Sequence, residues 1–147
     1  MLKSMDGTEI RPLDISDIDK VAEIYAEVTG NDILDTERLL NQIDNSLTSL
    51  AVEKDGQLIG FIIGGVLEDA FGTIEKVGLI NMIGIDPSFS GAGLGKKLGE
   101  EIISNFQGLG ITKIRTIVED SDTSLQKYFK SIGMKKVEWS VFEVDKS

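Results

Sequence analysis

A run of ten apolar and glycine residues, Leu58–Leu67, constrains the fold of this chain more than any other feature. It follows Lys54-Asp55-Gly56-Gln57, a tight hairpin turn in which Gly56 accepts a positive φ. Because the run does not alternate between apolar and polar residues, neither of its faces is expected to meet water, which predicts a central strand of a sheet. The run is also too short to cross a bilayer and holds three glycines.

Hydrophobic periodicity predicts further elements on both sides of this run. Strands are expected at 9–13, 50–53, 74–85, 111–118 and 136–144. Helices are expected from a cap at Ser16 to a stop at Gly30, over 36–45, over 93–107, and from a cap at Asp120 or Asp122 to Gly133. This order, with its hairpins, predicts an α+β fold with a mostly antiparallel sheet.

Composition bounds the chemistry. The 147 residues suit one domain, 1–147, and they include no Cys and no His. This excludes disulfides, thiolate metal sites, a cysteine nucleophile and a Ser-His-Asp triad, and it removes the usual zinc ligand. Catalysis is left to carboxylates, Tyr, Lys, hydroxyls, backbone groups or water.

The net charge of −10 argues against a nucleic-acid partner, because most of the surface would repel phosphates. The charge favours solubility, and it also suits a cationic substrate such as an amine; the composition leaves both explanations open. The N-terminus has no apolar core of signal-peptide length, so we expect a cytoplasmic protein without a membrane partner.

The segment from Ile83 to Leu98 combines a strand end, a tight turn and a helix start, with glycine at 91, 93 and 95. A helix N-terminus offers unpaired N–H groups and partial positive charge, and glycine lets a phosphate approach the backbone closely. Lys96 and Lys97 add local positive charge to an acidic protein. The pattern predicts a phosphate-binding turn.

Two phosphate-binding motifs do not fit this turn. The dinucleotide motif G-x-G-x-x-G fails because Lys96 stands where its last glycine belongs. The Walker A motif fails because three residues separate Gly91 from Gly95 instead of four, and Lys97 occupies the hydroxyl position.

The turn instead resembles the core motif of the GNAT superfamily of acyl-CoA-dependent N-acyltransferases, R/Q-x-x-G-x-G/A after an apolar-x-apolar-Asp-Pro strand end. Gly93 and Gly95 match the glycine positions, and 83–87 matches the strand end. Ser90 departs from the family's Arg or Gln. The family's later helix signature is echoed by Asp122, Tyr128-Phe129 and Gly133-Met134, and the element order agrees over nearly the whole chain.

This resemblance implies a GNAT-like fold, a mixed and mostly antiparallel sheet with helices on both faces, that binds acetyl-CoA and no metal. The pyrophosphate is expected on the turn amides, and the pantetheine arm along the preceding strand end, where an N–H can stabilise an oxyanion. The implied cofactor-binding residues are Ile83, Gly84, Ile85, Ser90, Gly91, Ala92, Gly93, Leu94, Gly95, Lys96, Asp122 and Phe129.

Catalytic residues are less sharply marked. The candidates for assisting amine deprotonation are Glu75, Glu119 and Asn81 acting through a water. The family's frequent acid, a Tyr four residues before the helix-ending glycine, is replaced by Phe129. Its neighbour Tyr128 is the candidate acid, although it also fits a core position, and water is the other proton source. Asp122 stands where the family commonly has Asn and can cap the helix, contact the cofactor, or both.

The resemblance implies a transferase that moves an acetyl group from acetyl-CoA to a primary amine, on a small molecule or a protein, by direct attack. The alternative is a non-catalytic acyl-CoA-binding or sensing module with the same fold. In either case the final predicted strand, 137–144, can pair between protomers and form a homodimer.

Overall fold

The computed structural model describes the backbone of residues 2–3 and residues 7–30, 37, 39, 43, 48–68 and 75–147. Within these residues a six-stranded sheet has the order β1-β2-β3-β4-β5-β6. Its strands are β1 (Leu2–Lys3), β2 (Thr8–Pro12), β3 (Ser49–Lys54), β4 (Gln57–Leu67), β5 (Val77–Ile85) and β6 (Lys113–Arg115). All neighbours pair antiparallel except β5 and β6, which are parallel, so the prediction of a mostly antiparallel mixed sheet is confirmed.

The described helices are the 3-10 helices η1 (Ile15–Asp17) and η3 (Pro87–Phe89) and the α-helices α1 (Ile18–Thr29), α3 (Leu94–Gly108) and α4 (Thr123–Ser131). Gly30 ends α1 in the left-handed conformation, as predicted. The predicted helix over 36–45 lies largely outside the described residues.

The β3–β4 hairpin and the central strand agree with the sequence. Asp55 and Gly56 both have positive φ, 51° and 82°, the combination that a two-residue type I′ turn requires. Residues 58–64 of β4 are buried, and the strand lies between β3 and β5. The continuous apolar run thus occupies the middle of the sheet, where both faces are covered.

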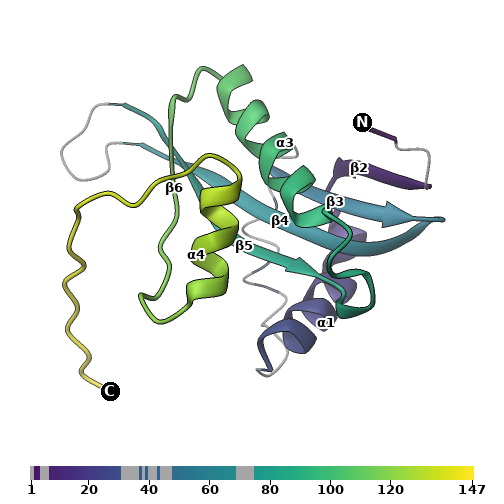
Figure 1. The fold of residues 1–147 in the computed structure, drawn as a ribbon, viewed down its shortest axis with the longest axis horizontal. Helices are drawn as coiled ribbons and strands as arrows, with labels where there is room; N and C mark the ends of the chain where they lie inside the picture. Colours follow the sequence, from purple (N-terminus) through teal and green to yellow (C-terminus); the bar gives the residue numbers. More distant parts are fainter. Residues whose placement is uncertain are drawn as a thin grey trace.

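Helices cover both faces of the sheet (Figure 1). One core cluster packs α3 and α4 against one face through residues such as Leu98, Ile102 and Phe106. The other packs α1 against the opposite face through residues such as Val21 and Ile24. Strand residues alternate between the two clusters because successive side chains point to opposite faces.

An irregularity in β5 shapes the centre of the molecule. Ile63 pairs with Met82 and Gly64 pairs with Ile80, so Asn81 is an extra residue in β5, a β-bulge. The strands β5 and β6 pair only from Val77–Lys113 to Leu79–Arg115. Beyond that point a side chain bridges them, since Thr116 Oγ1 donates a 2.9 Å hydrogen bond to the Ile80 carbonyl. The second half of β5 therefore has a neighbouring strand on one edge only, within the described residues.

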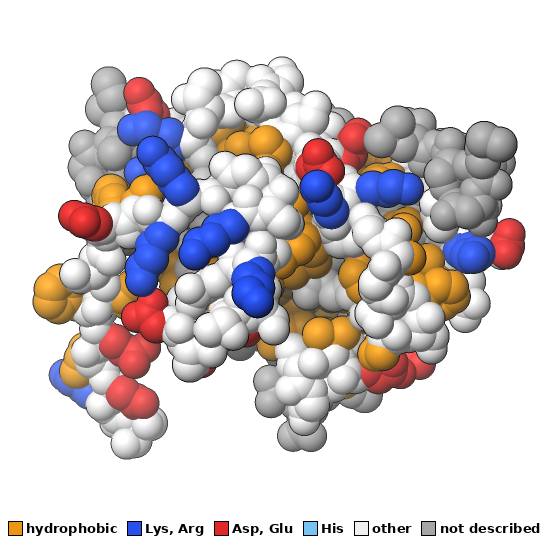
Figure 2. All heavy atoms as spheres, in the orientation of Figure 1, with side chains coloured by type: hydrophobic (Ala, Val, Ile, Leu, Met, Phe, Trp, Pro, Cys, Tyr) orange, Lys and Arg blue, Asp and Glu red, His pale blue; other side chains and the backbone are white. Residues whose placement is uncertain are grey.

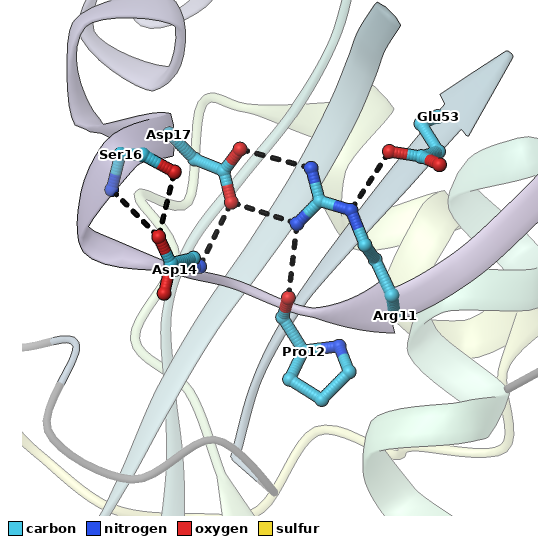
Figure 3. A network of polar contacts seen from close by, with 6 residues as sticks. All are labelled: Arg11, Pro12, Asp14, Ser16, Asp17 and Glu53. Carbon is cyan, nitrogen blue, oxygen red and sulfur yellow. Dashed lines mark hydrogen bonds and ion pairs between the residues drawn. The ribbon is translucent and has the colours of Figure 1, made fainter. Parts of the chain in front are cut away.

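The entry to α1 differs from the prediction. Asp14, rather than Ser16, caps the first turn, because the Asp14 carboxylate accepts from the Ser16 N–H and hydroxyl (Figure 3). Asp17 binds the Arg11 guanidinium with both oxygens, at 2.8 and 2.9 Å. Arg11 Nε also donates to Glu53 at 2.8 Å, so one guanidinium joins β2, β3 and the start of the helix.

The predicted final strand over 136–144 is wrong. Residues 134–147 form neither helix nor strand, and the side chains of Val137, Trp139, Val141, Phe142 and Val144 are exposed. A strand needs a neighbour to satisfy its backbone groups, and no described strand of the same chain pairs with this segment. The predicted strand over 111–118 is likewise reduced to Lys113–Arg115.

Among the residues that the structure describes, no helix has the length and apolar character needed to cross a membrane.

Candidate acyl-CoA site

The turn between β5 and α3 is held by its own side chains. Asp86 Oδ1 accepts a 3.0 Å hydrogen bond from the Ser88 N–H and caps η3. Ser90 Oγ donates to the Pro87 carbonyl at 3.0 Å. The hydroxyl at the departing motif position thus stabilises the turn, and its oxygen keeps the capacity to accept but adds no positive charge.

Two glycines of the turn face open space. Gly91 and Gly93 have φ of +83° and +77°, a backbone conformation that strains any residue with a Cβ. A Cβ built at either position meets no described atom within 4 Å, so the backbone is open to a ligand. Ala92 between them is also exposed.

The first turn of α3 follows directly. Gly93 is its N-cap, with no side-chain cap, and the Lys97 N–H bonds the Gly93 carbonyl at 3.2 Å. The N–H groups of Leu94, Gly95 and Lys96 precede that bond and have no carbonyl one turn earlier in the helix. They concentrate partial positive charge at the turn.

Charge around α3 and α4 contrasts with the rest of the chain. Residues 94–136 contain eight Lys or Arg and five Asp or Glu, a net charge of +3. The remaining residues contain seven and twenty, a net charge of −13. Lys and Arg side chains are spread across the face that carries α3 and α4 (Figure 2). An anion approaching this face meets a local exception to the acidic surface.

The bulge in β5 determines which backbone N–H and C=O groups face the edge of the strand that β6 leaves open. The Asp86 N–H donates to the Ile59 carbonyl of β4 at 2.8 Å, so by alternation the backbone of Gly84 also faces β4. The backbone groups of Ile83 and Ile85 then face the other edge, where β6 has parted from β5. Extended ligands bind sheets by pairing with such an edge.

Gly84 has a packing role in this arrangement. A Cβ there would lie 2.8 Å from Phe61 Cε1 and 3.3 Å from Ile24 Cγ2, beneath α1. Gly84 lies on the sheet face that α1 covers, and its backbone groups face β4 instead of the open edge of β5. The structure therefore does not bring Gly84 together with the other predicted cofactor-binding residues.

Tyr128 is the predicted catalytic residue that lies at the turn. Its hydroxyl donates a 2.7 Å hydrogen bond to the carbonyl of Gly95, in the first turn of α3. Burial, with a smaller contribution from the charge of Glu100, raises the pKa of Tyr128 above its ordinary value. The hydroxyl is therefore protonated and already donates to the protein.

Phe129 and Asp122 lie elsewhere on α4. The Phe129 ring is 7% exposed, belongs to the core and meets Tyr128 edge to face at 5.0 Å between centroids. Asp122 caps α4 by accepting from the Leu125 N–H at 3.0 Å, and the residue is exposed. Of the two roles considered for Asp122, the structure displays the cap.

The candidate bases are not gathered at the turn. Glu75 lies before the start of β5, at the opposite end from the turn, and pairs with Lys113 at 3.6 Å. Six residue-to-residue steps of chain lead from it to the bulge at Asn81, roughly 20 Å if extended. Glu119 is exposed, and Asn81 is the exposed bulge residue itself. Of the three candidates, Asn81 is the one that lies on β5 itself.

Side chains for a metal are not clustered either. Among the described residues, no group of three or more His, Cys, Asp or Glu side chains could hold a metal ion.

The sequence matches the model of the acetyltransferase (GNAT) family over residues 15–134, which is most of the chain. The protein belongs to the GNAT acetyltransferase family.

Curated relatives of this GNAT protein include acetyltransferases with different acceptors. It is 27% identical over 89 residues to a mycothiol acetyltransferase of Thermobispora bispora, covering 60% of this chain and 30% of that protein. It is 28% identical over 99 residues to a [ribosomal protein bS18]-alanine N-acetyltransferase of Haemophilus ducreyi, covering 67% and 63%. The chain thus spans less than a third of the first relative and under two thirds of the second.

Solved structures share the fold of the GNAT chain. An aminoglycoside N-acetyltransferase in complex with CoA superposes with a TM-score of 0.81 at 16% identity, covering all of both chains. A ribosomal-protein-alanine N-acetyltransferase of Brucella melitensis gives 0.76 at 18% identity, covering 95% of this chain and 99% of that one. At these identities the likeness concerns the fold.

Sequence reasoning missed Gly99, whose lack of a side chain makes room for Tyr128. A Cβ at Gly99 would lie 2.5 Å from the Tyr128 hydroxyl oxygen and 2.8 Å from Ile132 Cδ1. The spacing of Gly95 and Gly99, one helical turn apart, is the only signal in the sequence that could have indicated a close neighbour for this helix.

Proposed function

We propose that this GNAT protein transfers an acetyl group from acetyl-CoA to a primary amine. The observation that carries the proposal is one continuous path: an exposed glycine turn at a helix N-terminus leads into a strand edge from which the neighbouring strand has parted. A long substrate with a pyrophosphate at one point and an amide-containing arm at the next fits such a path.

The residues of this path have distinct parts. The turn backbone from Ser90 to Lys96 holds the pyrophosphate, and the outward backbone groups of Ile83 and Ile85 pair with the pantetheine arm. Acetyl-CoA supplies a thioester whose acetyl carbon is open to attack. As the amine nitrogen bonds to that carbon and the bond to sulfur breaks, an N–H at the strand edge offsets negative charge on the acetyl oxygen.

Protons must also move. The acceptor enters as an ammonium, which must lose a proton before attack because its ordinary pKa is near ~10.4. Asn81, at the bulge, is the proposed residue to hold a water that takes this proton, while the distant Glu75 is a weaker candidate. The nitrogen loses its second proton, to water, as the amide forms. The CoA thiolate leaves and is protonated by water or by an acid, for which Tyr128 is the prediction from sequence.

A second candidate function is an acyl-CoA-binding module without transfer activity. The specific observation that favours it is the engaged Tyr128 hydroxyl together with the core position of Phe129. On this alternative the chain binds acyl-CoA and releases no thiol.

The partners and location follow from the same proposal. The strongly acidic chain outside residues 94–136 suits a cationic acceptor such as an amine, and the protein is proposed to act in the cytoplasm. A second copy of the chain is proposed as the partner of residues 137–144.

Calorimetry with CoA and acetyl-CoA, followed by a thiol-release assay over a panel of amines, separates these proposals. Binding with release on at least one amine supports the transferase. Binding without release on any amine supports the module, and absence of binding contradicts both. The panel needs aminoglycosides and a peptide with a free N-terminal alanine, since similar proteins are named for these acceptors, and simple mono- and polyamines as further primary amines.

A further inference from the structure

The ring of Tyr128 is seated in a groove formed by two glycines of α3. A Cβ at Gly95 would lie 3.4 Å from Tyr128 Cε1, and one at Gly99 would lie 2.5 Å from the hydroxyl oxygen. Because these glycines are one turn apart, they present a strip of bare backbone against which the tyrosine of α4 packs. The hydroxyl oxygen of Tyr128 defines this contact, because it donates a 2.7 Å hydrogen bond to the Gly95 carbonyl.

The acceptor of this hydrogen bond lies in the candidate site. The carbonyl of Gly95 belongs to the same peptide group as the N–H of Lys96, one of the N-terminal donors of α3. A hydrogen bond accepted by a carbonyl fixes the plane of its peptide group and polarises the N–H at the other end. The hydroxyl of Tyr128 thus acts on a donor that it does not touch.

We propose that Tyr128 is a positioning residue for acyl-CoA binding, which holds the Gly95–Lys96 peptide group so that the Lys96 N–H points at the pyrophosphate. The proposal rests on the proposed function, in which this turn binds acyl-CoA. It gives the hydroxyl a task that differs from proton donation to the leaving thiolate.

The surroundings of the phenol suit this task. Burial and the charge of Glu100 raise its pKa, so the hydroxyl keeps its proton and remains a donor at neutral pH. The same shift makes it a weaker acid, whereas an efficient general acid has a pKa near the working pH. Edge-to-face contact with Phe129 holds the ring in place.

The first test compares Tyr128→Phe with the wild type. We expect the dissociation constant for CoA, measured by calorimetry, to rise about three- to tenfold, the equivalent of one hydrogen bond. With an amine that turns over, KM for acetyl-CoA should rise by the same factor while kcat and its pH profile stay unchanged. Tyr25→Phe is the matched control, because Tyr25 lies on α1 against the opposite face of the sheet, and it should leave CoA affinity unchanged.

Other outcomes overturn the proposal. An unchanged CoA affinity in folded Tyr128→Phe, with or without a lower melting temperature, shows that the hydroxyl serves stability alone. A fall in kcat with a shifted pH profile and an unchanged KM assigns it to proton donation. If the wild type itself binds no CoA, the proposed function fails and this inference fails with it. If the wild type binds CoA and Tyr128→Phe binds it equally well, only this inference fails.

A second variant approaches the same contact from α3. In Gly99→Ala the new methyl group displaces the Tyr128 oxygen, so CoA affinity should fall as it does in Tyr128→Phe. The double variant should bind CoA no more weakly than Gly99→Ala alone, because both changes remove one shared hydrogen bond. Losses that multiply in the double variant contradict a shared contact.

Discussion

At the scale of single residues, one helical step decides what two neighbouring aromatic rings do. Consecutive residues of a helix point about 100° apart. Tyr128 consequently faces the bare backbone of α3, while Phe129 is buried in the core. The family motif predicts an acid at 129, but the only phenol of α4 is directed at the first turn of the neighbouring helix.

The buried phenol makes stability depend on alkaline pH. The pKa of Tyr128 is raised in the folded protein, mainly by burial, so the folded state holds its proton more tightly than the unfolded state. This contribution is fully present below the unfolded pKa of about 10 and is lost as pH rises above it. Urea unfolding at pH 8 to 11 should show a steeper alkaline loss for the wild type than for Tyr128→Phe. Parallel profiles contradict the prediction.

Arg11 is the second residue whose contacts organise more than its own surroundings. Its guanidinium joins Asp17, at the start of α1, to Glu53 in β3 (Figure 3). The hydrogen bonding of the Arg11 guanidinium to the Asp17 carboxylate is the largest cause of a raised Arg11 pKa, so the cation persists at any working pH. The network ties the start of α1 to β2 and β3.

Removing the Asp17 charge should weaken this junction more than removing the Glu53 charge. The side chain of Asp17 is 11% exposed and binds with two oxygens, whereas that of Glu53 is 23% exposed and binds with one. We expect Asp17→Asn to lower the free energy of unfolding by about 1–3 kcal/mol, and Glu53→Gln to lower it less. Urea midpoints of the two variants provide the comparison, and an equal or reversed order refutes it.

At the scale of elements, the junction of β5 with α3 is built from a bulge, a side-chain-capped turn and glycines. The bulge at Asn81 reverses which backbone groups face the open edge, and the parallel pairing with β6 has already stopped at Leu79. No single residue produces the path described above. It results from a strand that loses one neighbour where the next helix begins.

Gly93 and Gly30 offer a matched test of this junction. Both have positive φ at a helix end, +77° and +71°, and a Cβ at either meets nothing within 4 Å. Alanine at either position should cost about 1–2 kcal/mol of stability through backbone strain. Only Gly93→Ala should also weaken CoA binding, measured by calorimetry below the melting range, because only that turn faces the pyrophosphate. Equal CoA affinity in both variants argues against the proposed site.

At the scale of the whole molecule, two features stand apart from the packing of the fold: the segregation of charge and the exposed C-terminal segment. Charge is segregated, with net +3 in residues 94–136 and −13 elsewhere. The C-terminal segment leaves the body of the protein after α4 (Figure 1). Its apolar side chains, such as Phe142 at 93% and Val144 at 77% exposed, are costly to leave in water.

The exposed segment predicts a homodimer. It contains Glu138, Glu143 and Asp145, and β6, the last strand of the described sheet, carries Lys113 and Arg115. A second copy can supply the missing strand neighbour, with matching charge. Light scattering should give twice the chain mass of 16.0 kDa. The double variant Val141→Lys and Phe142→Lys should give a folded monomer, and a monomeric wild type refutes the prediction.

The sequence alone determined the features that depend on neighbouring residues. The hairpin at Asp55-Gly56, the central apolar strand, the left-handed stop at Gly30 and the glycine turn before α3 are local, because φ preference and side-chain period are properties of a few residues. The family follows from the same local patterns, including the strand end at 83–87 and the spacing of Gly93 and Gly95.

Only the tertiary structure decided which groups meet. It directed Tyr128 rather than Phe129 to α3, assigned Gly84 to packing, and separated Glu75 from the turn by the whole of β5. It also left residues 136–144 without a strand partner in their own chain, although their alternation predicted a strand. A side-chain pattern records a residue's preference for burial or pairing, but the partner that satisfies it lies far away in sequence and is fixed only when the elements pack.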